Sequence, residues 1–230
     1  MKTMLTNLLS LTITGLVFSG CSASKTNDEI RSVLLQHGVE IELVKTPIGL
    51  WVGETEVTQS QWEAVMGNNP AQFKEPNNPV ETVSWGDCQT FLEKLNDLPS
   101  VKESGLAFRL PTDEEWEYAC RAGATGDFCK LGNGTEITES TLGMVAWFED
   151  NSDKQPHAVG QKEPNAFGVY DMIGNVHEWT QTADGESKVF CGGGWNFSAE
   201  FCKASSKAKL LPSYRSDSFG FRLCADNKKE

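Results

Sequence analysis

Basic side chains are scarce in this 230-residue chain. Its 20 lysines and arginines are outnumbered by 32 aspartates and glutamates, which gives a formal net charge of −12. Nucleic acid binding depends on clustered Lys and Arg that neutralise phosphates, so the composition argues against nucleic acid as a partner. Removal of a leading segment that carries Lys2 would make the chain more acidic still.

Signatures of zinc sites and of membrane spans are also missing. No C-x-x-C pair or Cys/His cluster occurs, and His37, His157 and His177 stand far apart, which argues against a zinc site. Beyond residue 20, no apolar run approaches the roughly 20 residues that a transmembrane helix needs. We therefore expect membrane contact only through a lipid anchor.

The N-terminus has the pattern of a bacterial export signal. Lys2 precedes an apolar run over residues 5–18, and two small residues then precede Cys21. This arrangement predicts a lipoprotein signal peptide over residues 1–20 and acylation of the Cys21 thiol. The alternative is an ordinary secretory signal with an incidental cysteine, because Phe18 stands where an aliphatic residue is usual.

The rest of the chain suits one large domain. Residues 21–40 begin with a mostly polar stretch and are predicted to be a tether, residues 41–226 the domain, and residues 227–230 a tail. We expect a monomer anchored in the bacterial cell envelope, on the outer-membrane surface. Six further cysteines can form disulfides after export, in a pairing that the sequence leaves open: Cys88, Cys120, Cys129, Cys191, Cys202 and Cys224.

Three helices are predicted in the first half of the chain. Thr58 with Gln61, and Thr112 with Glu115, have the spacing of capping boxes, and Ser84 precedes apolar residues at three- and four-residue intervals.

Strand and loop patterns surround these helices. Residues 51–57 read as a half-buried strand, residues 70–79 as a loop rich in Asn and Pro, and no helix longer than a few turns is expected beyond Gly123. The pattern predicts an α+β domain with much ordered loop.

Six sequence blocks follow one another in a distinctive order. They are EVT at 56–58, PVE at 79–81 with VSW at 83–85, RLPT at 109–112 with EEWEYA at 114–119, PNAFGVYDM at 164–172, GNV at 174–176 with EW at 178–179, and GG at 192–193 through GFR at 220–222. This set resembles the formylglycine-generating enzyme, or sulfatase-modifying factor, family over residues 48–224. The resemblance implies a C-type-lectin-like fold, with a small antiparallel sheet flanked by two principal helices and long ordered loops.

Enzymes of that family use oxygen and copper to oxidise a sulfatase cysteine to formylglycine. The copper is held by the thiolates of two cysteines, which lie five positions apart after a Gly-Gly turn. Thiolates are soft ligands that suit Cu(I), and one sulfur alone does not complete the linear site. In this chain the second position falls on Cys202, but the first falls on Phe197. We therefore expect no catalytic residue and no catalytic cofactor. A copper-dependent oxidase or other enzyme that uses Cys202, together with Cys191, is the alternative.

The resemblance also implies a structural calcium ion. Its ligands would be the side chains of Asp171 and Glu178 and the backbone carbonyls of Gly174 and Val176, an all-oxygen set that suits a hard cation. In the alternative interpretation, the two carboxylates cap turns or pair with an arginine.

Two kinds of position interleave over residues 192–222. Framework residues keep the family's form, and between them lie nine residues without helical or strand periodicity: Phe197, Ser198, Phe201, Ser206, Leu210, Tyr214, Ser216, Asp217 and Ser218. This arrangement is similar to the variable proteins of diversity-generating retroelements, above all the treponemal ones. In those systems an error-prone reverse transcriptase randomises adenines in the codons of this stretch. All nine residues can be encoded by the NNY codons that such randomisation produces.

A surface that combines Phe and Tyr with Ser and Asp has the composition of a versatile binding site. We therefore predict a non-catalytic, surface-displayed lipoprotein that binds a protein or other macromolecular ligand through these nine residues. Two alternatives stay open: Phe197, Phe201 and Leu210 are core residues of an ordinary family member, or the chain is a structural envelope lipoprotein.

Overall fold

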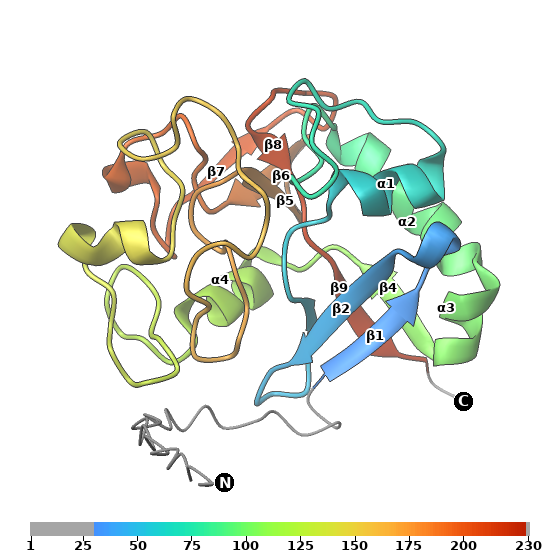
Figure 1. Cartoon of the computed structure of the whole chain (residues 1–230), viewed down its shortest axis with the longest axis horizontal. Coiled ribbons are helices and arrows are strands. Elements are labelled where there is room, and N and C mark those ends of the chain that lie inside the picture. The colour runs from blue at the N-terminus through green and yellow to red at the C-terminus, as the bar shows by residue number, and fades with distance from the viewer. Residues whose placement is uncertain (1–29, 229–230) are drawn as a thin grey trace, which may run out of the picture.

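Two β-sheets organise the part of the chain that the computed structural model describes, residues 30–228 (Figure 1). The five-stranded sheet is antiparallel throughout and has the order β1 (Ile30–Leu34), β2 (Glu40–Lys45), β3 (Trp51–Gly53), β9 (Cys224–Asn227), β4 (Leu106–Arg109). The four-stranded sheet has the order β7 (Lys207–Leu210), β6 (Ser187–Cys191), β5 (His177–Asp184), β8 (Phe219–Gly220), and its β5–β8 pair is parallel.

The last strand, β9, lies inside the five-stranded sheet, between β3 and β4. β9 pairs with β3 through Trp51–Ala225 and with β4 through Phe108–Ala225. The segment between β6 and β9 pairs with the four-stranded sheet again through β7 and β8, and it then enters the five-stranded sheet at β9. Both of its ends are fixed by strand pairing, which makes it a supported surface segment.

The three predicted helices are confirmed. They are α1 (Gln59–Met66), α2 (Trp85–Asp97) and α4 (Asp113–Arg121), and a short α3 (Pro99–Ser104) follows α2. Thr58, Ser84 and Thr112 each close a reciprocal capping box that satisfies two backbone N–H groups at the helix start. Helices α1 to α3 gather beside the five-stranded sheet, where α2 and α3 contact β4 (Figure 1).

Long ordered loops make up most of the chain between α4 and β5. In the described residues 122–176 the only helical element is the 3-10 helix η2 (Glu139–Met144), as the sequence predicts. Loop backbone groups are paired across the fold: Ala166 N–H donates to Lys130 O and Asn175 N–H to Trp147 O. Such pairing is what allows irregular backbone to be buried.

The tether prediction is wrong from Ile30 onward. The range 21–40 contains β1 and the 3-10 helix η1 (Gln36–Gly38), and Val33 and Leu35 are buried in the main core. The domain thus begins before residue 41, because these apolar side chains cover the sheet. The predicted signal peptide, 1–20, and Cys21 lie outside the described residues, as do residues 229 and 230 of the predicted tail.

All six cysteines of the domain are buried and free, so no disulfide links the described residues. Aromatic packing contributes to the core instead: the Phe91 ring stacks on Trp62 at 5.3 Å and meets the edge of Phe221 at 5.4 Å. In the described part of the chain, no helix has the length and apolarity to cross a bilayer.

Candidate functional site

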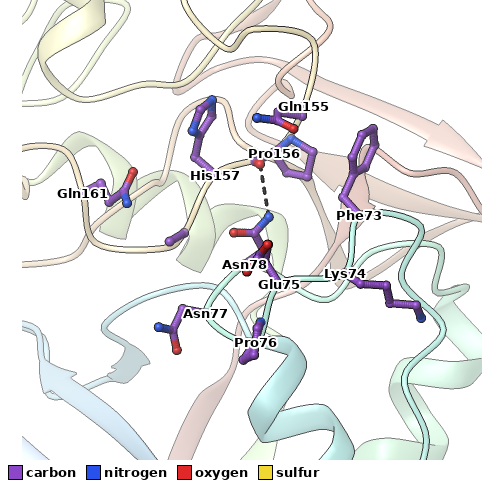
Figure 2. A pocket seen from close by; sticks show the side chains of 11 residues that line it. Phe73, Lys74, Glu75, Pro76, Asn77, Asn78, Gln155, Pro156, His157 and Gln161 are labelled. Carbon is purple, nitrogen blue, oxygen red and sulfur yellow. Dashed lines mark hydrogen bonds between the residues drawn. The ribbon is translucent and has the colours of Figure 1, made fainter.

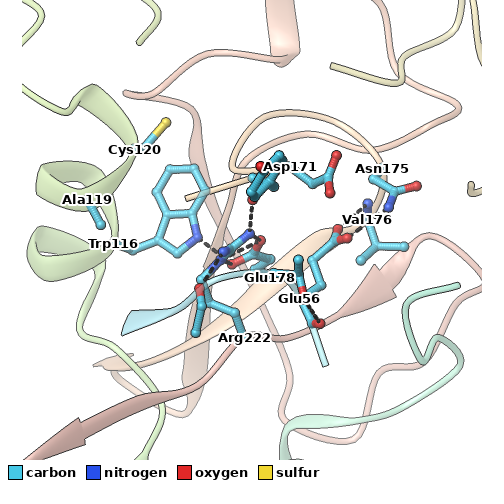
Figure 3. A network of polar contacts seen from close by, with 12 residues as sticks. Glu56, Trp116, Ala119, Cys120, Asp171, Asn175, Val176, Glu178 and Arg222 are labelled. Carbon is cyan, nitrogen blue, oxygen red and sulfur yellow. Dashed lines mark hydrogen bonds and ion pairs between the residues drawn. The ribbon is translucent and has the colours of Figure 1, made fainter. Parts of the chain in front are cut away.

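A buried ion pair fixes the frame of the C-terminal segment (Figure 3). The Arg222 guanidinium donates to both oxygens of Glu178 at 2.8 to 3.0 Å, and also to the carbonyls of Gly53 and Tyr170 at 3.0 and 2.9 Å. Trp116 donates its indole N–H to the same carboxylate at 2.6 Å. Arg222 and Glu178 are 0% and 1% exposed. This network therefore joins β3, α4, β5 and the chain entering β9 at one point.

Two more carboxyl groups are buried near the pair. Glu56 accepts hydrogen bonds from the Asn175 amide at 2.8 Å and from Val176 N–H at 3.1 Å, and burial raises its pKa well above the usual range. Asp171 accepts from Gly160 N–H at 2.7 Å, while its Oδ1 has no hydrogen-bond partner. Burial raises the pKa of Asp171 to about 6.

Glu178 does not fit the calcium shell implied by the family. Both of its oxygens are engaged by Arg222 and Trp116, so its charge is already neutralised. Gly174 has φ +79°, and a Cβ there would overlap the Trp147 carbonyl, so this glycine is required for close packing. No group of three His, Cys, Asp or Glu residues within 30–228 is arranged to hold a metal ion. Of the predicted side-chain ligands, only Asp171 keeps a free oxygen, and calcium stays a prediction.

Five of the nine predicted ligand-binding residues line one hollow of about 370 Å³. They are Phe197, Phe201, Ser206, Leu210 and Tyr214. Phe201 and Tyr214 are 53% and 42% exposed at its rim. Large apolar side chains that stay exposed around a concave surface are typical of interaction sites. The exposure of Phe201 also argues against a core role for that residue.

The floor of the hollow is aromatic. The His177 ring lies 4.5 Å from Phe197, 4.9 Å from Phe190 and 4.9 Å from Phe219, while Tyr214 packs against Phe219 at 5.2 Å. Burial lowers the pKa of His177 to about 4, although the backbone of Cys191 acts in the opposite direction, so the imidazole is neutral at pH 7.

Strand pairing explains how these rings meet. The parallel β5–β8 pair places His177 opposite Phe219, and the antiparallel β6–β7 pair places Phe190 opposite Ala208. Cross-strand partners share one face of a sheet. The sequence prediction missed the lining residues supplied by this pairing: His177, Phe190, Lys207, Ala208 and Phe219. The apolar residues 189–191 of strand β6 were the available signal, but neither the register of the strand nor its partners could be read from the sequence.

The other four predicted residues do not line the hollow. Ser198 precedes the 3-10 helix η3 (Ala199–Phe201). The carbonyls of Ser216, Asp217 and Ser218 accept from Thr82 N–H, the Trp195 indole and His177 N–H, so this turn is tied to the frame through its backbone. The Ser218 side chain is 2% exposed, which leaves it little access to a ligand.

Cys202 is a buried thiol. Its sulfur lies 3.7 Å from the Phe197 carbonyl and 3.9 Å from the Gly194 carbonyl, within reach of weak S–H hydrogen bonds. Burial raises the pKa of Cys202 to about 12, and burial also raises that of Cys191. Neither sulfur is a thiolate at neutral pH, and thiolates are the copper ligands and nucleophiles of cysteine chemistry.

A second hollow, of about 470 Å³, lies between loops 73–78 and 155–161 (Figure 2). Its lining is polar, but several of its groups are already paired: the Asn78 amide donates to Pro156 O at 3.2 Å, and His157 Nε2 lies 2.7 Å from Ser152 O. The His157 ring also stacks on Trp147 at 3.8 Å. None of the nine predicted residues lines it.

Fold and site together define a C-type-lectin-like domain of the formylglycine-generating type, as predicted. The sulfatase-modifying factor enzyme 1-like domain matches residues 22–227, and the chain belongs to that family. The predicted family and fold class are thus confirmed.

Three relatives show the range of the family. The chaperone protein LppX of Paenibacillus barcinonensis is 29% identical, over 91% of this chain and 94% of its own. The inactive C-alpha-formylglycine-generating enzyme 2 of Bos taurus is 29% identical, over 74% of this chain and 57% of its own. Treponema denticola variable protein 1 superposes with a TM-score of 0.73 and 27% identity, over 85% of this chain and 98% of its own. The chain spans little more than half the length of the curated formylglycine-generating relatives. These similarities are consistent with a non-catalytic member of the family.

Proposed function

We propose that the chain is a non-catalytic lipoprotein of the bacterial cell envelope that binds macromolecular ligands through the C-terminal face around the aromatic hollow. One observation carries this proposal: five residues chosen by sequence pattern, from Phe197 to Tyr214, line the same hollow. The similarity to the Treponema denticola variable protein supports a diversified face. The ion pair beneath it supplies a frame that does not depend on the face residues.

The residues at the two copper-binding positions of the family support the absence of formylglycine chemistry. Phe197 takes the place of the first copper cysteine, and Cys202 is a buried, protonated thiol. A single thiol is a poor Cu(I) site. The similarity to an inactive family member agrees with this interpretation. Oxygen uptake with a sulfatase-motif peptide and Cu(I), lost in Cys202→Ala, would overturn it.

Site-directed photocrosslinking on intact cells tests the binding face. A photoreactive phenylalanine analogue at Tyr214 is expected to join the ligand. The same analogue at Ile48, which is 63% exposed on the β2–β3 turn, is the matched control and is expected to give no such product. The proposal is contradicted if both positions give the same amount of crosslinked product. It is also contradicted if adding Phe201→Ser to the Tyr214 crosslinking variant does not reduce the product. One constant partner recovered from every strain points instead to a structural envelope protein.

A chaperone function is the second candidate, because LppX aligns over nearly the whole of both chains. The exposed Phe201 and Tyr214 would then hold partly folded proteins. Suppression of citrate synthase aggregation by the wild-type chain, and its loss in Phe201→Ser with Tyr214→Ser, supports this function. A receptor with a single folded ligand leaves the aggregation unchanged.

The lipid anchor is proposed from the sequence of residues 1–21 alone. Cys21→Ser is expected to move the exported protein from the detergent phase to the aqueous phase of a Triton X-114 extract, because the acyl chains supply the membrane affinity. Unchanged partitioning contradicts lipidation at Cys21. Digestion by protease added to intact cells then tests surface display.

A further inference from the structure

The floor of the hollow holds an unpaired polar group. His177 is 6% exposed, and neither of its ring nitrogens makes a hydrogen bond of ordinary geometry among the described residues, although the Cys191 backbone lies near enough to act on its pKa. Nearly all buried polar side chains in folded proteins are paired, because an unpaired one keeps its full desolvation penalty. An unpaired imidazole that lines a hollow is therefore in position to form a hydrogen bond with a polar atom of a bound ligand.

The surroundings of His177 define what that atom can belong to. Phe190, Phe197 and Phe219 pack their rings around it, so an incoming group must present an apolar body to these walls. A charged group would lose its hydration against the aromatic rings without an opposite charge in return. The Lys207 ammonium, which also belongs to the lining, is held by Asp113 at 2.9 Å and Glu117 at 3.0 Å.

We propose that the hollow is an anchor site for one tyrosine side chain of a protein ligand, whose hydroxyl hydrogen-bonds to His177. This inference rests on the proposed binding function and names the ligand group that the site takes. A phenol hydroxyl is both donor and acceptor, so it pairs with either tautomer of a neutral imidazole. Its ring suits the aromatic walls in edge-to-face packing. His177 comes from the framework strand β5 and would impose this preference while the residues around it change.

Side-chain analogues test the proposal without knowledge of the whole ligand. Binding of p-cresol and toluene to the otherwise complete exported chain carrying Cys21→Ser is measured by ligand-observed NMR. We expect p-cresol to bind about five- to ten-fold more tightly than toluene, because its hydroxyl adds one net hydrogen bond to His177. In His177→Phe this preference is expected to disappear while toluene still binds. Tyr118→Phe, which removes a hydroxyl from helix α4 outside the lining of the hollow, is the matched control and is expected to keep it.

A second variant and a stability measurement guard against misfolding. His177→Gln keeps a hydrogen-bonding group and is expected to retain part of the preference. Urea unfolding of His177→Phe is expected to show no loss of stability, because an unpaired buried polar group is removed. Equal binding of both probes to the unsubstituted hollow, or a preference that survives His177→Phe, overturns the role of His177 and leaves the binding face intact. Failure of both probes to bind overturns the anchor site itself, while the crosslinking result decides the proposed function separately.

Discussion

At the scale of single residues, the contacts of Arg222 tie the C-terminal segment to distant parts of the fold. Its guanidinium binds Glu178 and the carbonyls of Gly53 and Tyr170, which belong to distant parts of the chain. The sequence placed Arg222 in the last of the family blocks and left open whether Glu178 binds calcium or pairs with an arginine. The structure favours the arginine, a choice that depends on three-dimensional proximity and could not be made from spacing alone.

Loss of Arg222 should destabilise the domain strongly. Arg222→Met leaves the Glu178 carboxylate buried without its partner, which typically costs about 3 to 5 kcal/mol in the free energy of unfolding. The double variant Glu178→Gln with Arg222→Met removes both charges and should lose less than the single variant. Urea denaturation measures both. A loss for Arg222→Met within about 0.5 kcal/mol, the range of ordinary surface substitutions, contradicts this role.

Asp171 should make stability depend on pH. Because its folded-state pKa, about 6, lies above the ordinary 3.8, the folded state holds the proton more tightly, and stability falls as pH rises from 3.8 to about 6. Asp171→Asn removes the buried charge, and its amide oxygen can still accept from Gly160. Asparagine also suits the φ of +52° at this position. The variant should gain roughly 2 to 3 kcal/mol near pH 7 and almost nothing near pH 4.

Chemical denaturation over this pH range, with and without calcium, checks the Asp171 prediction. A calcium ion bound to the carboxylate gives the opposite sign, because Asp171→Asn then loses stability when calcium is present. That result would support the calcium site that the family resemblance implies.

At the scale of elements, local signals predicted the helices well. Thr58, Ser84 and Thr112 mark helix starts through capping groups within three residues, so the sequence contains the whole determinant. The strand β1 was missed because its burial pattern shows only Val33 covered, which gives almost no apolar alternation. The hollow was only half predicted, since His177 and Phe219 become neighbours through a parallel pairing across 42 residues, which only the fold determines.

The turn after β6 should tolerate no side chain at Gly193. This glycine has φ +79°, and a Cβ would lie 2.6 Å from Cys202 Sγ and 2.9 Å from its Cα. Gly193→Ala should therefore cost about 1 to 2 kcal/mol for the backbone conformation and about 1 to 3 more for the overlap. Gly185→Ala is the control, because Gly185 has φ +61° but no atom within 4 Å of its Cβ position. Equal losses of unfolding free energy in the two variants would show that the close approach to Cys202 is unimportant.

At the scale of the whole molecule, an acidic domain of the formylglycine-generating family presents an aromatic hollow on a frame tied together by one buried ion pair. Family and fold class could be predicted because six motifs occur in the order typical of the family. Composition and periodicity alone would not have predicted this fold. Fold alone does not decide function, since one architecture serves enzymes and binding proteins alike. The proposed binding function of this chain depends on residues 192–222.

Sequencing the gene and its neighbourhood in independent isolates tests the diversified binding face most directly. The account predicts that substitutions concentrate in the codons of the nine interleaved positions, foremost those of Phe197, Phe201, Ser206, Leu210 and Tyr214. His177, Glu178 and Arg222 should stay unchanged, and an adenine-richer near-copy of the codons for residues 192–222 should lie nearby with a reverse-transcriptase gene. Substitutions spread evenly over the domain, with no such repeat, would contradict it.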